Sequence, residues 1–423
     1  MTFTQNPINE GRQRRIAVIG AGASGLVAAG SAAGAGADVI VFEGQNKTAK
    51  KLRITGKGRC NVTNNCDIAT FIQNVPRNPR FLYTALTAFS PEDTIDFFES
   101  LGVPLKTERG RRVFPASDRA SDIVRALEKF AFPAAKLCHE NVQRLIVEDG
   151  RVTGVAGSSS VYSADAVIVC TGGKSYPMTG SKGDGYRFAS ECGHTVTPLV
   201  PSLVPIEAKG NLCRRLQGLS LKNVSLKIIH TKTGKTIFED FGEMMFTHFG
   251  LTGPMVLSAS AHLRDYSLDT CVASIDLKPA LDEETLDARL LSDFAKYANK
   301  DFINALSDLL PSKMIGPMVE LSGIDPRQKV NTVTREERRG LLSLLKGLTI
   351  PLLRFRPIEE AIITSGGVEV KEINPRNMAS KKVKGLYFAG EVIDVDAYTG
   401  GFNLQIAFST GMLAGKSAAC DIW

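Results

Sequence analysis

Long apolar runs are absent from this chain of 423 residues. A helix that crosses a membrane needs roughly 18 or more consecutive apolar residues, and no stretch reaches that length. The opening residues, MTFTQNPINEGRQRR, also lack the apolar core of a secretory signal peptide. These two absences predict a cytoplasmic protein without a membrane partner.

Cysteines in the C-x-x-C spacing are missing as well. The chain has 8 cysteines, but without such a pair we expect neither a dithiol redox motif nor a zinc ribbon. Cys60 and Cys66 are the closest pair, and in a reducing compartment we expect buried thiols there rather than a disulfide. The sequence therefore predicts no metal site.

A nucleic-acid-binding signature is the third absence, although the net charge is +7. Most basic residues are scattered, and the one dense run is Lys47, Lys50, Lys51, Arg53, Lys57 and Arg59. Such a run suits anionic cofactors and substrates as well as RNA. Because no RNA-binding motif accompanies it, RNA binding is the minor interpretation.

A glycine-rich turn, GAGASG at residues 20–25, is the most informative local pattern. It follows a short apolar strand at 16–19, opens an alanine-rich helix at 24–35, and precedes a second strand at 38–42 that ends in Glu43. This order is the context that a dinucleotide-binding fold requires. The helix N-terminus would hold a pyrophosphate, and Glu43 would accept hydrogen bonds from ribose hydroxyls.

A second glycine-led helix is expected near the end of the chain, in TGGFNLQIAFSTG at residues 399–411. A buried strand at 386–389 precedes it, as in the first pattern. NAD is satisfied by one such helix, whereas extended FAD gains from a second at its ring. A helix N-terminus there would stabilise the negative charge of reduced flavin by up to ~2 kcal/mol. The two helices together predict FAD.

The middle of the chain has a different pattern. Alternating segments around Gly234 predict antiparallel strands, and apolar spacing after residue 280 predicts helices. We therefore expect an α/β fold in which a β-rich segment and a helical segment are inserted into a split Rossmann-like FAD-binding domain. The expected bounds are 1–198 and 364–423 for the FAD-binding domain, 199–275 and 326–363 for the β-rich segment, and 276–325 for the helical segment.

Three separated motifs resemble the bacterial BaiN-like flavoproteins. They are KKLRITGKGRCNVTN (50–64), FTHFGLTGP (246–254) and TSGGVEVKEINPRNMASKKVKGLYFAGEVIDVDAYTGGFNLQIAFSTG (364–411). This family contains NAD(P)/FAD-dependent oxidoreductases, with bile-acid reductases and aminoacetone oxidases among its members. The segment TGGKSYPMTGSKGDGYRFASECGH (171–194) is also similar to the flavin-side loop of the fumarate-reductase superfamily.

The resemblance implies that the β-rich segment is an inserted antiparallel β-barrel-like domain and that the helical segment is a small helical domain. It also implies non-covalent FAD and assigns residues along the cofactor. The residues expected to bind the pyrophosphate are Gly20, Gly22, Ala23, Ser24 and Gly25, and Glu43 is expected to bind the adenosine ribose. The residues expected along the cofactor are Lys51, Gly58, Arg59, Cys60 and Asn61. Val142 would contact the adenine, and the adenosine or phosphate side would be lined by Thr171 and Gly172. The phosphate and ribityl chain would contact Gly390 and Glu391, and the flavin ring would contact Gly401, Asn403 and Leu404.

Flavin chemistry needs a hydride partner and, for many substrates, a proton donor or acceptor. Tyr398, His248 and Arg59 are the candidates for the proton step, with His194 and Tyr176 behind them. Only one dinucleotide fingerprint precedes a helix in the expected context, so NAD(P)H would dock transiently against the flavin.

The predicted activity is FAD-dependent, NAD(P)H-driven reduction of an activated C=C bond in a small apolar or cyclic substrate. Two alternatives stay open. One is a flavin oxidase that acts on an amine or aminoketone and passes electrons to O2. The other is a flavin-dependent RNA-binding or RNA-modifying protein, suggested by the charge of +7. The sequence leaves the oligomeric state open.

Overall fold

The computed structural model describes residues 12–421, which divide into two compact units. Unit 1 joins the first part of the chain, up to Val200, to the last part, from Ile362 onward, and unit 2 is Pro201–Ala361. The predicted fold class is confirmed, because a parallel sheet with helices and a closed barrel are both present. The finer three-domain bounds stay a prediction.

A five-stranded parallel sheet forms the centre of unit 1, in the order β19-β10-β1-β2-β6. The strands are β1 (Arg15–Ile19), β2 (Asp38–Phe42), β6 (Lys136–Cys138), β10 (Ala166–Val169) and β19 (Leu386–Phe388). All four residues of β10 are buried, as expected for an inner strand covered on both faces. Strand β19 comes from the end of the chain and pairs with β10, so the sheet itself is discontinuous in sequence.

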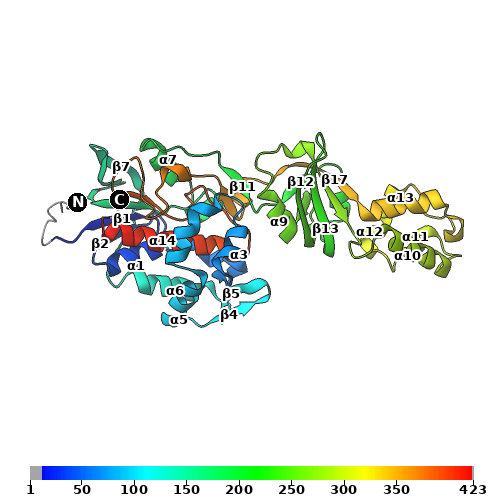
Figure 1. Ribbon diagram of the computed structural model, residues 1–423, viewed down its shortest axis with the longest axis horizontal. Coiled ribbons are helices and arrows are strands. Elements are labelled where there is room, and N and C mark those ends of the chain that lie inside the picture. The colour runs from blue at the N-terminus through cyan, green and yellow to red at the C-terminus, as the bar shows by residue number, and fades with distance from the viewer. Residues whose placement is uncertain (1–11, 422–423) are drawn as a thin grey trace, which may run out of the picture. The chain divides into compact units, whose positions relative to one another are not determined.

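Two helices from opposite ends of the chain pack against each other in unit 1. They are α1 (Ala23–Gly34), blue in Figure 1, and α14 (Phe402–Ala419), red. Their backbones approach closely: a Cβ on Gly411 would lie 2.5 Å from the carbonyl oxygen of Ser24. This contact brings the start of α14 into the same domain as the glycine turn.

Smaller elements complete unit 1. The side chains of Ser90 and Asp93 form a capping box at the start of α5. The helices are α2 (Lys50–Ile54), α3 (Ile68–Gln73), α4 (Tyr83–Ala88), α5 (Pro91–Ser100), α6 (Ala120–Ala131) and α7 (Asp184–Glu191). The strands are β3 (Thr63–Asn64), β4 (Leu105–Glu108), β5 (Arg112–Pro115), β7 (Val142–Glu148), β8 (Arg151–Gly157), β9 (Val161–Ser163) and β18 (Ile363–Ser365). Strand β11 (Val200–Ser202) begins at the last residue of the first part of unit 1 and ends in unit 2.

Unit 2 is built on a closed barrel in the order β12-β15-β14-β13-β16-β17. Its strands are β12 (Ile206–Ala208), β13 (Ser220–His230), β14 (Thr236–Phe246), β15 (Gly250–Thr252), β16 (Cys271–Asp276) and β17 (Leu348–Phe355). Its helices are α8 (Leu212–Arg215), α9 (Pro254–Ser260), α10 (Glu283–Lys296), α11 (Phe302–Ala305), α12 (Ser312–Ser322) and α13 (Arg335–Lys346). Helices α10–α13 gather at one end of the barrel and share one hydrophobic core with it (Figure 1).

Within residues 12–421, no helix combines the length and apolar character needed to cross a membrane. The same part of the chain contains no grouping of His, Cys, Asp and Glu side chains suited to a metal ion.

Candidate functional site

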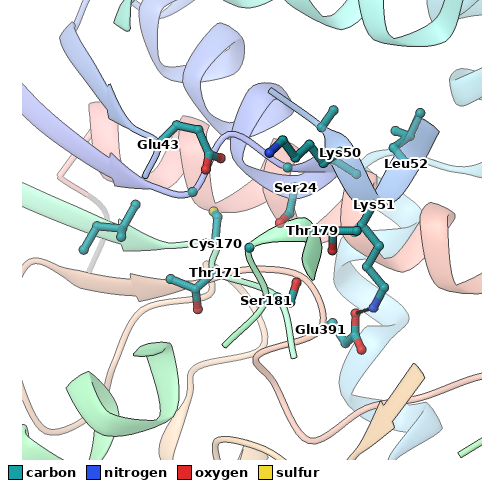
Figure 2. A pocket seen from close by; sticks show the side chains of 18 of the residues that line it. Ser24, Glu43, Lys50, Lys51, Leu52, Cys170, Thr171, Thr179, Ser181 and Glu391 are labelled. Atoms are coloured by element: carbon teal, nitrogen blue, oxygen red, sulfur yellow. Dashed lines mark hydrogen bonds and ion pairs between the residues drawn. The ribbon is translucent and has the colours of Figure 1, made fainter. Parts of the chain in front are cut away.

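One elongated pocket lies within unit 1, at the carboxyl ends of the parallel strands. Its walls come from the turns after β1, β2 and β10 and from the first turn of α14. Ligands of open α/β sheets bind at this edge, where loops leave the strands. Figure 2 shows Glu43 on one side of Ser24 and the Lys51–Glu391 pair on the other, so the lining side chains spread along a line.

The glycine turn after β1 forms the middle of the pocket. The Gly20 N–H donates to the carbonyl oxygen of Phe42 at 2.8 Å, which closes the turn onto the end of β2. Helix α1 begins at Ala23 without a side-chain cap, so the N–H groups of its first turn are free to bind an anion. A Cβ on Gly22 would meet no atom within 4 Å. Gly22 therefore keeps open the space that a phosphate would occupy.

Glu43 ends β2 at one side of this turn. Its carboxylate accepts hydrogen bonds from the Ala21 N–H at 3.0 Å and from the Gln45 N–H at 2.9 Å, which fixes the side chain beside the glycine turn. Burial raises the pKa of the Glu43 carboxyl, and the two backbone hydrogen bonds oppose that shift. The remaining acceptor capacity suits a ribose diol.

The N-terminus of α14 is the second uncapped helix start at the pocket. Gly401 precedes the helix with φ of +101°, and no side chain caps it. The Asn403 side chain accepts from the Ala397 N–H at 2.9 Å and donates to the Ala397 carbonyl at 2.7 Å. Asn403 thereby fixes the loop before the helix, and both Asn403 and Leu404 line the pocket.

A polar network closes the pocket beside β10. The Lys51 ammonium donates to Glu391 at 2.7 Å, as Figure 2 shows. It also donates to the Ser175 hydroxyl at 2.6 Å. The Thr364 N–H donates to the other oxygen of Glu391 at 2.8 Å. The Lys51 and Glu391 side chains are only 24% and 14% exposed, so the pair is shielded and holds a fixed geometry.

Two polar atoms near these elements have no hydrogen-bond partner within residues 12–421. They are the hydroxyl of Thr171, which lines the pocket, and the side-chain oxygen of Asn61. A buried polar atom without a partner is costly, and a bound ligand removes that cost. Together with the open space at Gly22 and the two uncapped helices, these atoms fit a long anionic ligand with a polar ring, as FAD is.

Most residues that the sequence assigned to FAD line this pocket. They are Gly20, Gly22, Ala23, Ser24, Glu43, Lys51, Val142, Thr171, Gly172, Glu391, Asn403 and Leu404. The remaining assigned residues lie outside the lining. They are Gly25, Gly58, Arg59, Cys60, Asn61, Gly390 and Gly401.

Several of the residues outside the lining support the pocket from behind. A Cβ on Gly25 would lie 1.8 Å from the carbonyl oxygen of Gly20, so this glycine lets α1 pack against the turn. A Cβ on Gly390 would lie 2.6 Å from the Ser24 hydroxyl oxygen. Cys60 is fully buried, and burial raises the pKa of its thiol to about 12. The FAD assignments of these residues stay predictions.

The three candidates for proton transfer lie in different surroundings. Arg59 pairs with Glu108 and Asp118 and stacks 4.2 Å above the Phe114 ring, so its charge is already neutralised. His248 is exposed on unit 2, beside Phe249. Tyr398 is half-buried in the loop that Asn403 holds. None of the three lines the pocket, and their catalytic roles stay predictions.

The two further candidates for proton transfer, His194 and Tyr176, lie in a core position and in a loop, respectively. His194 is buried, its ring nitrogen Nε2 lies 2.7 Å from the Ser380 hydroxyl, and burial lowers the pKa of the imidazole. Tyr176 adopts a left-handed backbone conformation with φ of +51° in the loop before Thr179. A structural role explains His194, because its contacts lie in the core.

Sequence reasoning missed other residues of the pocket. Gln45, Asn141 and Ser181 line it, and Ser175 and Thr364 hold the Lys51–Glu391 pair. Gln45 could have been predicted, because it lies only two residues after Glu43, in the loop that leaves the same strand. Thr364 was not, since only the tertiary fold brings it to Glu391.

The comparisons with known proteins agree with this geometry. A family model described as the HI0933-like protein Rossmann domain matches residues 14–417. A 3-dehydro-bile acid delta(4,6)-reductase of Clostridium scindens is 30% identical over 413 residues, which are 96% of this chain and 99% of the relative.

Two further relatives share a different name. Ribosomal RNA dihydrouridine synthase of Escherichia coli is 30% identical over 414 residues, covering 95% of this chain and 98% of the relative. The protein of that name in Haemophilus influenzae is 31% identical over 402 residues, covering 93% and 95%.

A solved structure resembles the whole chain. The 3-ketosteroid delta1-dehydrogenase of Sterolibacterium denitrificans has a TM-score of 0.51 and 11% identity, and the match covers 96% of this chain and 99% of the other. At this identity the likeness supports the fold alone.

Proposed function

The chain belongs to the HI0933-like protein Rossmann domain family and is an FAD-dependent oxidoreductase, and on that basis we propose that it reduces a C=C bond conjugated to a carbonyl group. The observation that carries the proposal is the shared reaction type of its relatives. One is named as a reductase of a 3-dehydro-bile acid, and two as synthases of dihydrouridine, the product of adding two hydrogens to uridine.

The pocket supports this chemistry from both ends. The first-turn N–H groups of α1 would hold the FAD pyrophosphate, and Glu43 the adenosine ribose. When bound, FAD supplies the hydride chemistry of the reaction. The N-terminus of α14 would stabilise negative charge at the ring by up to ~2 kcal/mol, and Asn403 keeps that helix start in place.

NAD(P)H is the proposed donor. The overall change is NAD(P)H plus a proton plus the C=C substrate, giving NAD(P)⁺ and the saturated bond. Residues 12–421 contain one five-stranded parallel sheet, and one glycine fingerprint joins a strand of this sheet to a helix, so NAD(P)H has no second domain of this kind there. It would reach the ring transiently, in alternation with the substrate.

Anaerobic mixing of the purified holoenzyme with NADH or NADPH tests the proposal. Loss of the oxidised flavin absorbance within the turnover time, followed by its return when a cyclic enone is added without oxygen, would support a reductase. Bleaching by an amine, with no response to either nicotinamide, would instead support the oxidase alternative and contradict the proposal.

A second candidate function has its own support: the C=C bond is that of a uracil base in RNA. The two dihydrouridine synthases are 30% and 31% identical to this chain, and the bile-acid reductase is 30% identical, with similar coverage in all three. Unit 1 contains thirty Lys and Arg against twenty-four Asp and Glu, a net charge of +6, whereas unit 2 contains twenty-one against twenty, a net charge of +1. The positive charge therefore lies on the unit that holds the pocket, where an RNA substrate needs it.

A further inference from the structure

Four exposed basic side chains stand on two neighbouring loops of unit 1. Lys57 is in the loop after α2, and Arg109, Arg111 and Arg112 are at the turn between β4 and β5. We call these four residues the basic hairpin surface. None of them forms an ion pair with a carboxylate in the described part of the chain.

Their neighbours differ in this respect. Arg59 and Lys106 lie in the same two segments, and both pair with Glu108 and Asp118. The local carboxylates are therefore already neutralised by these two residues. One further carboxylate, Asp67, accepts a hydrogen bond from the Thr70 N–H and caps α3. The hydrogen bonds from Thr70 and, after them, the Arg111 charge lower the pKa of the Asp67 carboxyl, so Arg111 lies near one local carboxylate. The charges of Lys57, Arg109 and Arg112 are left for an external anion.

The two loops form one surface because they contact each other. The Arg59 side chain and that of Arg112 both lie over the Phe114 ring, at 4.2 and 5.8 Å. The Asn65 N–H donates to the Arg111 carbonyl at 2.8 Å, which joins the hairpin turn to the strand that follows the Lys57 loop.

This surface is also tied to the N-terminus of α14. The Asn64 side-chain amide donates to the Gly110 carbonyl at 3.0 Å and to the Gly400 carbonyl at 3.1 Å. Gly400 immediately precedes Gly401, the residue from which α14 begins. One asparagine thus links the arginine turn to the helix start proposed for the flavin ring.

We propose that the basic hairpin surface binds the phosphate backbone of a single-stranded RNA segment whose base enters the flavin end of the pocket. Guanidinium groups suit this role, because each presents a planar fork of donors to phosphate oxygens. A small anionic substrate would need one such group, whereas a surface with three arginines and a lysine can contact more than one phosphate of a strand. The inference rests on the RNA candidate of the proposed function.

A charge-matched pair of variants tests the assignment. Arg109→Gln with Arg111→Gln removes two charges from the surface. Arg144→Gln with Arg376→Gln removes two exposed charges that also have no ion pair within residues 12–421 but lie outside the surface and outside the pocket. The probe is a short labelled single-stranded RNA rich in uridine, measured by fluorescence anisotropy with the flavin-loaded proteins over a series of salt concentrations.

The first pair should bind the RNA about tenfold more weakly than the wild type, and its salt slope should fall by about 1.4, since each lost phosphate contact removes about 0.7 for a single strand. The control pair should keep most of the affinity and slope. Equal losses in the two pairs, or no RNA binding by the wild type, would overturn the assignment. So would equally tight binding to vesicles of anionic phospholipid, because that would indicate a membrane surface instead.

The result is separable from that of the reductase proposal. A wild type that is bleached by NADPH and reduces a cyclic enone, yet binds no RNA, leaves the reductase standing and refutes the RNA surface. A wild type that binds RNA through these arginines, but whose flavin is bleached by neither NADH nor NADPH, supports the RNA surface and refutes the NAD(P)H-driven reductase.

Discussion

The two glycine-led helix starts look alike in sequence but differ in what surrounds them. At α1, a Cβ on Gly22 would meet nothing within 4 Å, whereas at α14 a Cβ on Gly401 would lie 2.3 Å from the backbone of Thr63. The first glycine keeps space for a ligand, and the second lets the chain pack against itself. The same residue type therefore serves binding at one site and folding at the other.

Replacing Gly22 tests the ligand side of this comparison and should have the largest effect. Gly22→Asp fills the open space with a carboxylate, so FAD affinity should fall at least about 100-fold, or ~2.8 kcal/mol. The apoprotein should stay as stable as the wild type, because Asp is a favourable N-cap residue and its Cβ meets no atom. Flavin titration and urea unfolding of the apoprotein measure the two quantities.

Gly34→Ala is the matched control in the same helix, since its Cβ also meets no atom. It should bind FAD normally. If Gly22→Asp lost apoprotein stability but kept its FAD affinity, Gly22 would serve the fold. The proposed difference between Gly22 and Gly401 would then be wrong.

Replacing Gly401 tests the folding side. Gly401→Ala places a Cβ against the Thr63 backbone at a φ of +101°, so the free energy of unfolding of the apoprotein should fall by about 1–3 kcal/mol. Gly340→Ala, in the interior of α13 with open space around it, should raise stability by up to about 1 kcal/mol. An apoprotein of Gly401→Ala with unchanged stability would contradict the account.

Asn403 sharpens the comparison, because it fixes the loop before α14 by three hydrogen bonds. Asn403→Ala should lower the free energy of unfolding by about 1–3 kcal/mol, since it leaves backbone groups of Ala397 without partners. Asn403→Asp keeps the acceptor for the Ala397 N–H but loses both donor bonds. Its free energy of unfolding should therefore lie between those of the wild type and Asn403→Ala. Equal stability of all three proteins would show that the loop is held by other contacts.

Glu43 gives the smallest expected effect and a test of pH. Burial raises the pKa of its carboxyl, and a bound ribose would favour the ionised form. FAD affinity should therefore be greatest above that raised pKa and decline as the pH falls through it. Glu43→Gln should bind FAD about tenfold more weakly at neutral pH and lack this decline. Parallel pH profiles for both proteins would contradict the role of Glu43.

The difference between the helix starts also explains what the sequence could predict. The turn at Gly20–Gly25 is local: strand, glycines, helix and Glu43 follow one another, so the fold and the phosphate site could be derived from spacing. A split domain was expected because the same pattern recurs near the end of the chain, but the pairing of its strand β19 with β10 was not predicted and comes from the structure. Alternating residues predicted the antiparallel strands of unit 2, and the family resemblance implied a barrel-like domain; the observed barrel is closed.

Contacts that join distant residues could not be predicted in the same way. The bond from Thr364 to Glu391 and the link from Asn64 to Gly110 and Gly400 depend on how separate loops meet. Arg59 was expected along the cofactor, but its ion pairs with Glu108 and Asp118 depend on a hairpin about 50 residues away. No local sequence pattern shows that Arg59, rather than a basic residue near it, will pair with these carboxylates.

The most direct test of the account is a titration of the apoprotein with FAD, FMN and ADP under identical conditions. If both helix starts hold one extended cofactor, FAD should bind with a stoichiometry of one and at least about 100-fold more tightly than either half-molecule. Binding of FMN as tight as that of FAD, or no uptake of FAD, would contradict the claim that the two ends of the chain share one flavin.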